Sequence, residues 1–145
     1  MYPVPVVQVV EALGGPDVLG EGVDTLSNLA GAVARGLPRS VIRQIADRAA
    51  PADAQLRNRI AALVASPATV KRSERLSPDA SARAERLARV VALAKHVFND
   101  ANEARAWLST PHLMLRRMPI EAAATDLGAR QVERLLHNIE YDLPA

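Results

Sequence analysis

The sequence contains no cysteine and very few aromatic residues. Phe, Trp and Tyr make up 3% of its 145 residues. Without cysteine the chain has no disulfide, no thiol nucleophile and no zinc site built on thiolates. Sheet proteins draw heavily on aromatic side chains, whereas the residues that dominate here, Ala, Leu, Val and Arg, favour packed helices. We therefore predict an all-α fold.

A long hydrophobic run is also missing. No stretch approaches the roughly 18 uncharged apolar residues of a membrane span. Residues 1–10 lack the basic start and the small-residue cleavage site of a secretory signal. We therefore expect a cytoplasmic protein with no membrane partner. With 49% hydrophobic residues, a chain of this length is able to bury a core without disulfides or metals.

The residues on which most enzymes depend are absent or scattered. His96, His112 and His137 are spaced too widely to form a ligand pair on one helical turn, so we interpret them as ordinary surface or core histidines. The glycines between residues 14 and 22 do not lead into Gly-Lys-Ser/Thr, and no Gly-x-Ser-x-Gly elbow occurs. We therefore expect no catalytic residue, no metal and no cofactor, and a protein that acts by binding.

The net charge of +2 hides an uneven distribution of charged residues. Residues 1–34 contain four acidic residues and no Lys or Arg, whereas residues 35–75 contain nine basic and three acidic residues. A basic segment is expected where a protein meets nucleic-acid phosphates, although a solvated helix face gives the same pattern.

Apolar spacing and turn residues predict helices along most of the chain. In the first half we expect a short helix or strand at 6–13, a helix over 24–35, one from Pro38 to about Pro51, and one around 56–64. Ser66-Pro67 then combines an N-cap with a first-turn proline and starts a short helix.

The second half repeats the same start signals. Ser77-Pro78 begins a long amphipathic helix that ends at Asn99, and Asp100 caps the next helix, which Thr110-Pro111 ends. A short turn begins at Pro119, and a final helix follows Gly128. We divide the chain into an N-terminal helical region (1–75), a connecting or dimerisation helix (76–99) and a C-terminal domain (100–145).

The three short helices between residues 37 and 75 indicate a helix-turn-helix unit. On this interpretation Ser66–Glu74 is the recognition helix, and its first turn enters the major groove of DNA. Such a unit also occurs as a plain packing module. The candidate DNA contacts are Arg57 and Arg59 to the phosphate backbone, with Ser66, Thr69, Lys71, Arg72 and Arg75 on or beside the recognition helix.

The last third carries a more specific series of motifs. These are WLSTP at 107–111, PIE at 119–121, TDLGARQVE at 125–133 and LLHNIEY at 135–141. Upstream of them, GLP at 36–38 precedes the helix-turn-helix, and RLSPD at 75–79 leads into the long helix that ends in VF at 97–98. This series resembles the Xre/MbcA/ParS antitoxins, and it is strongest from Leu76 onward.

The resemblance implies a non-catalytic antitoxin that neutralises a RES-domain toxin, an enzyme that consumes NAD. It implies that the C-terminal region covers the toxin's active site and that the helix-turn-helix binds operator DNA, as a homodimer, to repress the operon. The positions carried over for toxin binding are Trp107, Thr110, Pro111, Pro119, Gly128, Val132 and the tail Glu140, Tyr141, Asp142, Leu143, Pro144 and Ala145.

The chain departs from the family pattern between these positions. Relatives usually have Leu-Gly-Gly before the second proline, where this chain has Leu115, Arg116 and Arg117, and the loop is one residue shorter. We include these three residues among the candidate toxin contacts. Met118 stands where relatives tend to have a threonine cap, and its side chain has no acceptor for the helix N–H groups.

Several of these residues also have a structural interpretation. Trp107 is either a core anchor or an interface hot spot. We expect Gly128 to mark a turn with positive φ, and Pro111 and Pro119 to stiffen the loop at 113–117 so that it binds with a smaller entropy loss. The tail is expected to dock into the toxin. The alternative is a stand-alone transcriptional regulator that dimerises through the helix at 79–99.

Overall fold

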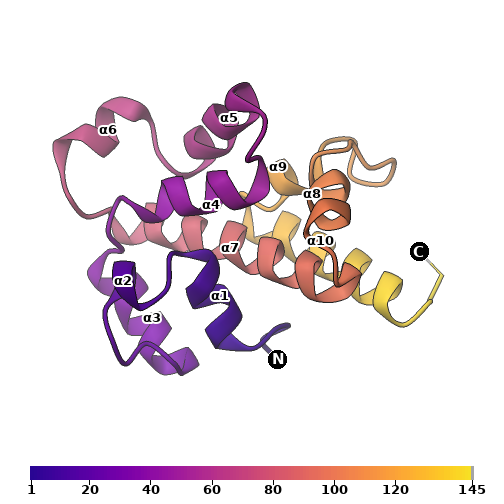
Figure 1. Ribbon diagram of the computed structural model, residues 1–145, viewed down its shortest axis with the longest axis horizontal. Helices are drawn as coiled ribbons and strands as arrows, with labels where there is room; N and C mark the ends of the chain where they lie inside the picture. Colours follow the sequence, from indigo (N-terminus) through magenta and orange to yellow (C-terminus); the bar gives the residue numbers. More distant parts are fainter. Residues whose placement is uncertain (145) are drawn as a thin grey trace.

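The computed structural model describes residues 1–144 and contains ten helices (Figure 1). They are α1 (Val6–Ala12), α2 (Pro16–Leu19), α3 (Leu26–Arg35), α4 (Val41–Ala49), α5 (Ala54–Val64), α6 (Pro67–Arg72), α7 (Pro78–Phe98), α8 (Ala101–Leu108), α9 (Pro119–Ala122) and α10 (Asp126–Glu140). Within these residues the only extended pairings are two isolated bridges. The all-α prediction is confirmed, and the short element at 6–13 is a helix.

The long helix α7 lies at the centre of the molecule (Figure 1). It packs against α1, α3, α4 and α5 from the first half and against α8, α9 and α10 from the second. Its residues from Val90 to Ala94 are all buried, as expected for a helix that is surrounded on every side. The buried side chains of both halves therefore belong to one hydrophobic core.

Most helices begin where a side chain accepts a backbone N–H. Ser66, Ser77 and Asp100 cap α6, α7 and α8 as predicted, and Asn99 ends α7 in the left-handed conformation. Met118 precedes α9 without a side-chain hydrogen bond. These starts were predictable because the capping oxygen and the backbone N–H that donates to it lie within three residues of each other.

Two predicted helix starts are wrong. Pro38 does not begin α4, which starts at Val41, because Pro38 is paired with Arg75 in an antiparallel bridge. The final helix starts before Gly128: Thr125 caps α10, whose first residue is Asp126. At Pro38 a neighbour distant in sequence decides the backbone conformation, whereas at α10 the prediction overlooked a local cap, the Thr125 hydroxyl that accepts the N–H of Gly128 (3.0 Å).

The pairing at Pro38 closes the helix-turn-helix region at its base. The N–H of Arg39 donates to the carbonyl oxygen of Glu74 (2.9 Å), and that of Leu76 donates to Leu37 (2.8 Å). The buried hydroxyl of Ser81, on α7, accepts the N–H of Leu37 (2.8 Å). The two ends of the segment with α4, α5 and α6 are thus held together and attached to α7. No helix in the described part of the chain is long and apolar enough to cross a membrane.

Candidate functional site

The basic end of the molecule is formed by α4, α5 and α6. Helix α6 lies at one extreme of the molecule, away from the central helix (Figure 1), and carries the exposed side chains of Lys71 and Arg72. Ser66 and Thr69 interact at its start, where their hydroxyl oxygens are 2.8 Å apart. The candidate DNA residues of α6 therefore divide into two exposed cations and two residues of the N-terminal cap.

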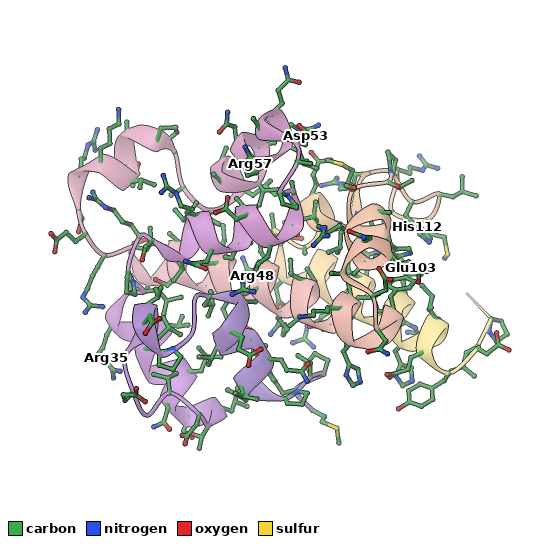
Figure 2. The ribbon with its side chains drawn as sticks, viewed as in Figure 1. Arg35, Arg48, Asp53, Arg57, Glu103 and His112 are labelled. Atoms are coloured by element: carbon green, nitrogen blue, oxygen red, sulfur yellow. The ribbon has the colours of Figure 1, made fainter. Side chains whose placement is uncertain are left out.

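The other predicted DNA contacts are engaged within the chain. Arg57 Nη1 donates to the carbonyl oxygens of Ala50 (3.0 Å) and Pro51 (2.7 Å), which follow α4. Figure 2 shows Arg57 near Asp53, at the beginning of α5. Arg59 forms an ion pair with Glu121 of α9 at 2.5 Å. Arg57 thus holds the turn between α4 and α5, and Arg59 connects α5 to the C-terminal region.

Arg75 is also engaged, since its Nη1 donates to the carbonyl oxygen of Gly36 at 2.9 Å. The structure adds two arginines that the sequence interpretation missed. Arg39 and Arg43 line a groove between α4, α5 and α6, and Arg39 Nη1 donates to the Val70 carbonyl (3.3 Å). Arg39 precedes α4 and Arg43 lies in its first turn, so the only signal available in the sequence was the four-residue spacing of two basic residues.

At the opposite end, residues 112–117 between α8 and α9 form a compact turn. The N–H of His112 donates to the carbonyl oxygen of Arg117 (3.0 Å), and the N–H of Arg116 donates to that of His112 (2.8 Å). Arg116 has φ +58°. Leu113 and Met114, at the tip of this turn, are 92% and 61% exposed. The predicted loop therefore presents apolar side chains in a defined conformation.

Trp107 is half-buried and packs against His112 at the start of the turn. Its ring centroid lies 6.1 Å from that of Phe98 and 6.1 Å from that of His112. Thr110 Oγ1 donates to the carbonyl oxygen of Ala106 (2.6 Å), and Pro111 follows at the exposed surface. The aromatic contacts thus connect the end of α7 to the base of the turn.

Three predicted toxin contacts are buried within the chain. Pro119, Gly128 and Val132 have little or no exposure and lie in or against the core. In this conformation they are not accessible to a partner, and they affect the toxin-binding surface only through the residues that they support. Gly128 also lacks the positive φ that we expected: it is helical, and a Cβ there would collide with the carbonyl oxygen of Ala122. The glycine is required by the close approach of α9 to α10.

The tail folds back along the end of α10. Glu140 pairs with His96 of α7 (3.1 Å), and the ring of Tyr141 lies 4.7 Å from that of His137. The N–H of Leu143 donates to the carbonyl oxygen of Asn138 (2.7 Å). Tyr141, Asp142, Leu143 and Pro144 are exposed, and Ala145 lies outside the described residues. The turn and the tail lie at the same end of the molecule, opposite α6 (Figure 1).

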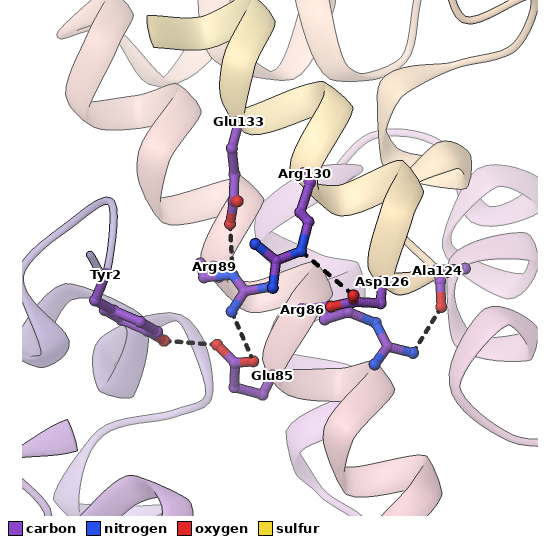
Figure 3. A network of polar contacts seen from close by, with 8 residues as sticks. All are labelled: Tyr2, Glu85, Arg86, Arg89, Ala124, Asp126, Arg130 and Glu133. Atoms are coloured by element: carbon purple, nitrogen blue, oxygen red, sulfur yellow. Dashed lines mark hydrogen bonds and ion pairs between the residues drawn. The ribbon is translucent and has the colours of Figure 1, made fainter. Parts of the chain in front are cut away.

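A polar network joins the first residues of the chain to α10 (Figure 3). Tyr2 donates to Glu85 of α7 (2.6 Å), and Arg89 pairs with both Glu85 (3.3 Å) and Glu133 (2.7 Å). Burial raises the pKa of Glu133, and the nearby Arg89 opposes this shift. Burial, followed by the Glu85 carboxylate, raises the pKa of the Tyr2 hydroxyl. These groups connect the first residues of the chain to α10 through α7.

In residues 1–144 no group of three His, Cys, Asp or Glu side chains is arranged to hold a metal ion. His96 pairs with Glu140, and His137 packs on Tyr141. His112 accepts the N–H of Met114 through Nδ1 (3.1 Å) and therefore has a role within the turn.

Comparisons with known proteins match both ends of the molecule. The family model described as the antitoxin Xre-like helix-turn-helix domain matches residues 29–89. The model of the antitoxin Xre/MbcA/ParS C-terminal toxin-binding domain matches residues 93–141.

A curated protein of Pseudomonas putida, named antitoxin Xre, is 35% identical over 71 residues, which is 48% of this chain and 45% of that protein. The chain thus spans about half the length of the curated relative that it matches. The helix-turn-helix match precedes the toxin-binding match in the chain, and α7 extends across the boundary between them. The chain therefore belongs to the Xre/MbcA/ParS-type antitoxins.

Proposed function

We propose that the chain neutralises a RES-domain toxin, an NAD-consuming enzyme, by binding it and covering its active site. One observation carries the proposal: exposed apolar side chains are concentrated in the region matched to the toxin-binding domain. Five of the nine large hydrophobic residues that the described structure exposes lie there, namely Leu113, Met114, Leu127, Ile139 and Tyr141, and a sixth, Leu143, follows just after the matched range. Such a concentration is typical of a surface that a partner covers.

In this proposal the tail, Glu140–Ala145, occupies the toxin's active site and supplies no reactive group. The test is co-expression with the RES-domain protein of the same operon, with bacterial growth and co-purification as the readouts. The full chain is expected to restore growth. A chain that lacks residues 140–145 is expected to remain bound to the toxin without restoring growth. Full rescue by the shortened chain contradicts the role of the tail, and failure of the full chain to bind contradicts the proposed function.

We also propose that the basic end binds operator DNA and so represses the operon. The candidate contacts are Lys71 and Arg72 of α6, joined by Arg43 of α4 and by Arg39, which lies just before α4. Replacement of Lys71 and Arg72 by alanine is expected to weaken DNA binding and to lower the slope of log K against log salt by about 0.9 for each lost phosphate contact. Toxin binding is the control and is expected to stay unchanged. An unaltered salt slope contradicts the assignment.

A homodimer would present two copies of α6 to neighbouring half-sites about one helical turn apart. The apolar stripe of α7 does not supply the contact, because it is buried within the chain. Sedimentation of the free chain tests this part of the proposal: a dimer mass is expected at micromolar concentration, and a monomer mass at every concentration contradicts it.

A further inference from the structure

The turn at 112–117 combines apolar exposure with a fixed conformation. An isolated exposed leucine is common on protein surfaces. Here Leu113 and Met114 are adjacent at the tip of a turn whose two ends are hydrogen-bonded to each other through His112 and Arg117. A fixed apolar tip loses little conformational entropy when a partner covers it, which is a property of interface anchors.

His112 organises this turn from within. Its carbonyl oxygen accepts the N–H groups of Leu115 (3.1 Å) and Arg116 (2.8 Å). Its ring accepts the N–H of Met114 through Nδ1 (3.1 Å) and packs edge-on against Trp107. Figure 2 shows His112 beside α8, on the end of the molecule that carries the turn. The side chain of His112 thus fixes the direction in which the tip projects from α8.

The charge around the tip has one sign. Residues 104–120 contain Arg105, Arg116 and Arg117 and no Asp or Glu. Arg116 and Arg117 are exposed and follow the tip after Leu115. A surface complementary to this turn has an apolar pocket with acidic groups on its rim.

We propose that the turn is the anchor by which the chain holds its toxin: Leu113 and Met114 enter an apolar pocket of the toxin, Arg116 and Arg117 face carboxylates on its rim, and His112 is the positioning residue. This inference rests on the proposed function. It assigns affinity to the turn and leaves active-site coverage to the tail, so the two segments have separable effects.

The test measures the dissociation constant of the complex with the RES-domain protein of the same operon. The double variant Leu113→Ser/Met114→Ser is expected to bind about 30-fold more weakly or worse, as for the loss of central apolar anchors. The double variant Arg116→Glu/Arg117→Glu is expected to bind at least about tenfold more weakly, by an effect that shrinks with added salt. Both pairs are exposed, so an unchanged thermal unfolding midpoint shows that the fold is intact.

The matched control is Val7→Ser/Leu26→Ser, which removes two apolar side chains with 54% and 50% exposure from the other half of the chain. It is expected to bind like the original chain. His112→Ala is expected to weaken binding and to speed hydrogen exchange of the Met114 amide. His112→Asn offers an oxygen acceptor for the Met114 N–H. Compared with His112→Ala, it is expected to bind the toxin more tightly and to exchange the Met114 amide more slowly.

The outcomes separate the two proposals. If the unaltered chain fails to bind the RES-domain protein, the proposed function fails. If it binds and the Leu113→Ser/Met114→Ser variant binds equally well, the anchor is disproved and the proposed function stands. An equal loss in the Val7→Ser/Leu26→Ser control also overturns the anchor, since any exposed apolar pair would then have the same effect.

Discussion

Arg116 adopts a left-handed backbone conformation that side chains other than glycine rarely take, with φ +58°. Replacement by glycine removes the Cβ that opposes this conformation. We expect Arg116→Gly to raise the free energy of unfolding by about 0.5–1 kcal/mol, measured by urea denaturation. The neighbour Arg117 does not have positive φ, so Arg117→Gly is the control and is expected to lower stability by a similar amount. Equal effects of the two substitutions contradict this explanation.

Gly128 is required because a neighbouring helix leaves no room for a side chain, and not because its own backbone conformation needs a glycine. A Cβ at this position would collide with the carbonyl oxygen of Ala122, which is backbone and has little room to move. We expect Gly128→Ala to lower the free energy of unfolding by about 3 kcal/mol or more. Gly31 is the matched control, because a Cβ there meets only the flexible end of Arg35. Gly31→Ala is expected to stabilise α3 by about 0.5–1 kcal/mol.

These residues mark the limit of sequence-based prediction. The caps Ser66, Ser77 and Asp100 were predicted correctly because each depends on neighbours three residues away. The role of Gly128 was predicted wrongly, because it depends on the path of α9, which no local pattern reveals. The engagement of Arg59 was missed for the same reason, because its partner Glu121 lies on α9, whereas the carbonyl partners of Arg57 lie in the nearby turn after α4.

At the scale of the element, α5 contains two arginines with different roles. Arg57 holds two carbonyl groups at the end of α4, and Arg59 forms an exposed ion pair with Glu121. We expect Arg57→Ala to lower the free energy of unfolding by about 1–2 kcal/mol, because carbonyl groups lose a charged donor. Arg59→Ala is expected to cost about 0.5 kcal/mol, the usual value for an exposed pair. Chemical denaturation of both variants distinguishes them, and equal losses contradict the assignment.

The helices themselves were largely predictable. Apolar spacing located α3, α5, α8 and α10 to within a few residues, because each has one face against the core, and the Ser77-Pro78 start signal located α7. The start of α4 was not predictable, since the pairing of Pro38 with Arg75 joins segments far apart in the sequence. The exposed tip at Leu113 and Met114 was only partly anticipated: the flanking prolines predicted a stiff loop, but exposure depends on the complete fold.

At the scale of the whole molecule, Glu133 connects stability to pH. Burial raises the pKa of its carboxyl above the ordinary 4.5, so the folded state holds this proton more tightly than the unfolded state. The stability that Glu133 contributes is therefore present at low pH and decreases as pH rises through its raised pKa. We expect the difference in free energy of unfolding between the original chain and Glu133→Gln to fall as pH rises above about 4.5. Urea denaturation at a series of pH values measures this trend, and a difference that rises with pH contradicts it.

The separation of the two ends leads to a further expectation. Helix α6 lies at one extreme of the molecule, and the turn and tail lie at the other (Figure 1). A toxin bound at the turn therefore leaves α6 accessible. We expect the toxin complex to bind duplex DNA with an affinity within about threefold of that of the free chain, apart from the charge that the toxin adds. Fluorescence anisotropy with labelled DNA measures both affinities, and a loss of DNA binding on addition of toxin contradicts the expectation.

The surrounded helix α7 limits how such a protein can be recombined. In a chimera of two related antitoxins whose junction lies within α7, some α7 side chains come from one protein while the helices that they contact come from the other. Chimeras that transfer DNA specificity or toxin specificity between relatives therefore need the parental residues restored around the circumference of α7. In this protein the helices of both halves pack along the same helix, α7, so no single position in the chain separates the two domains.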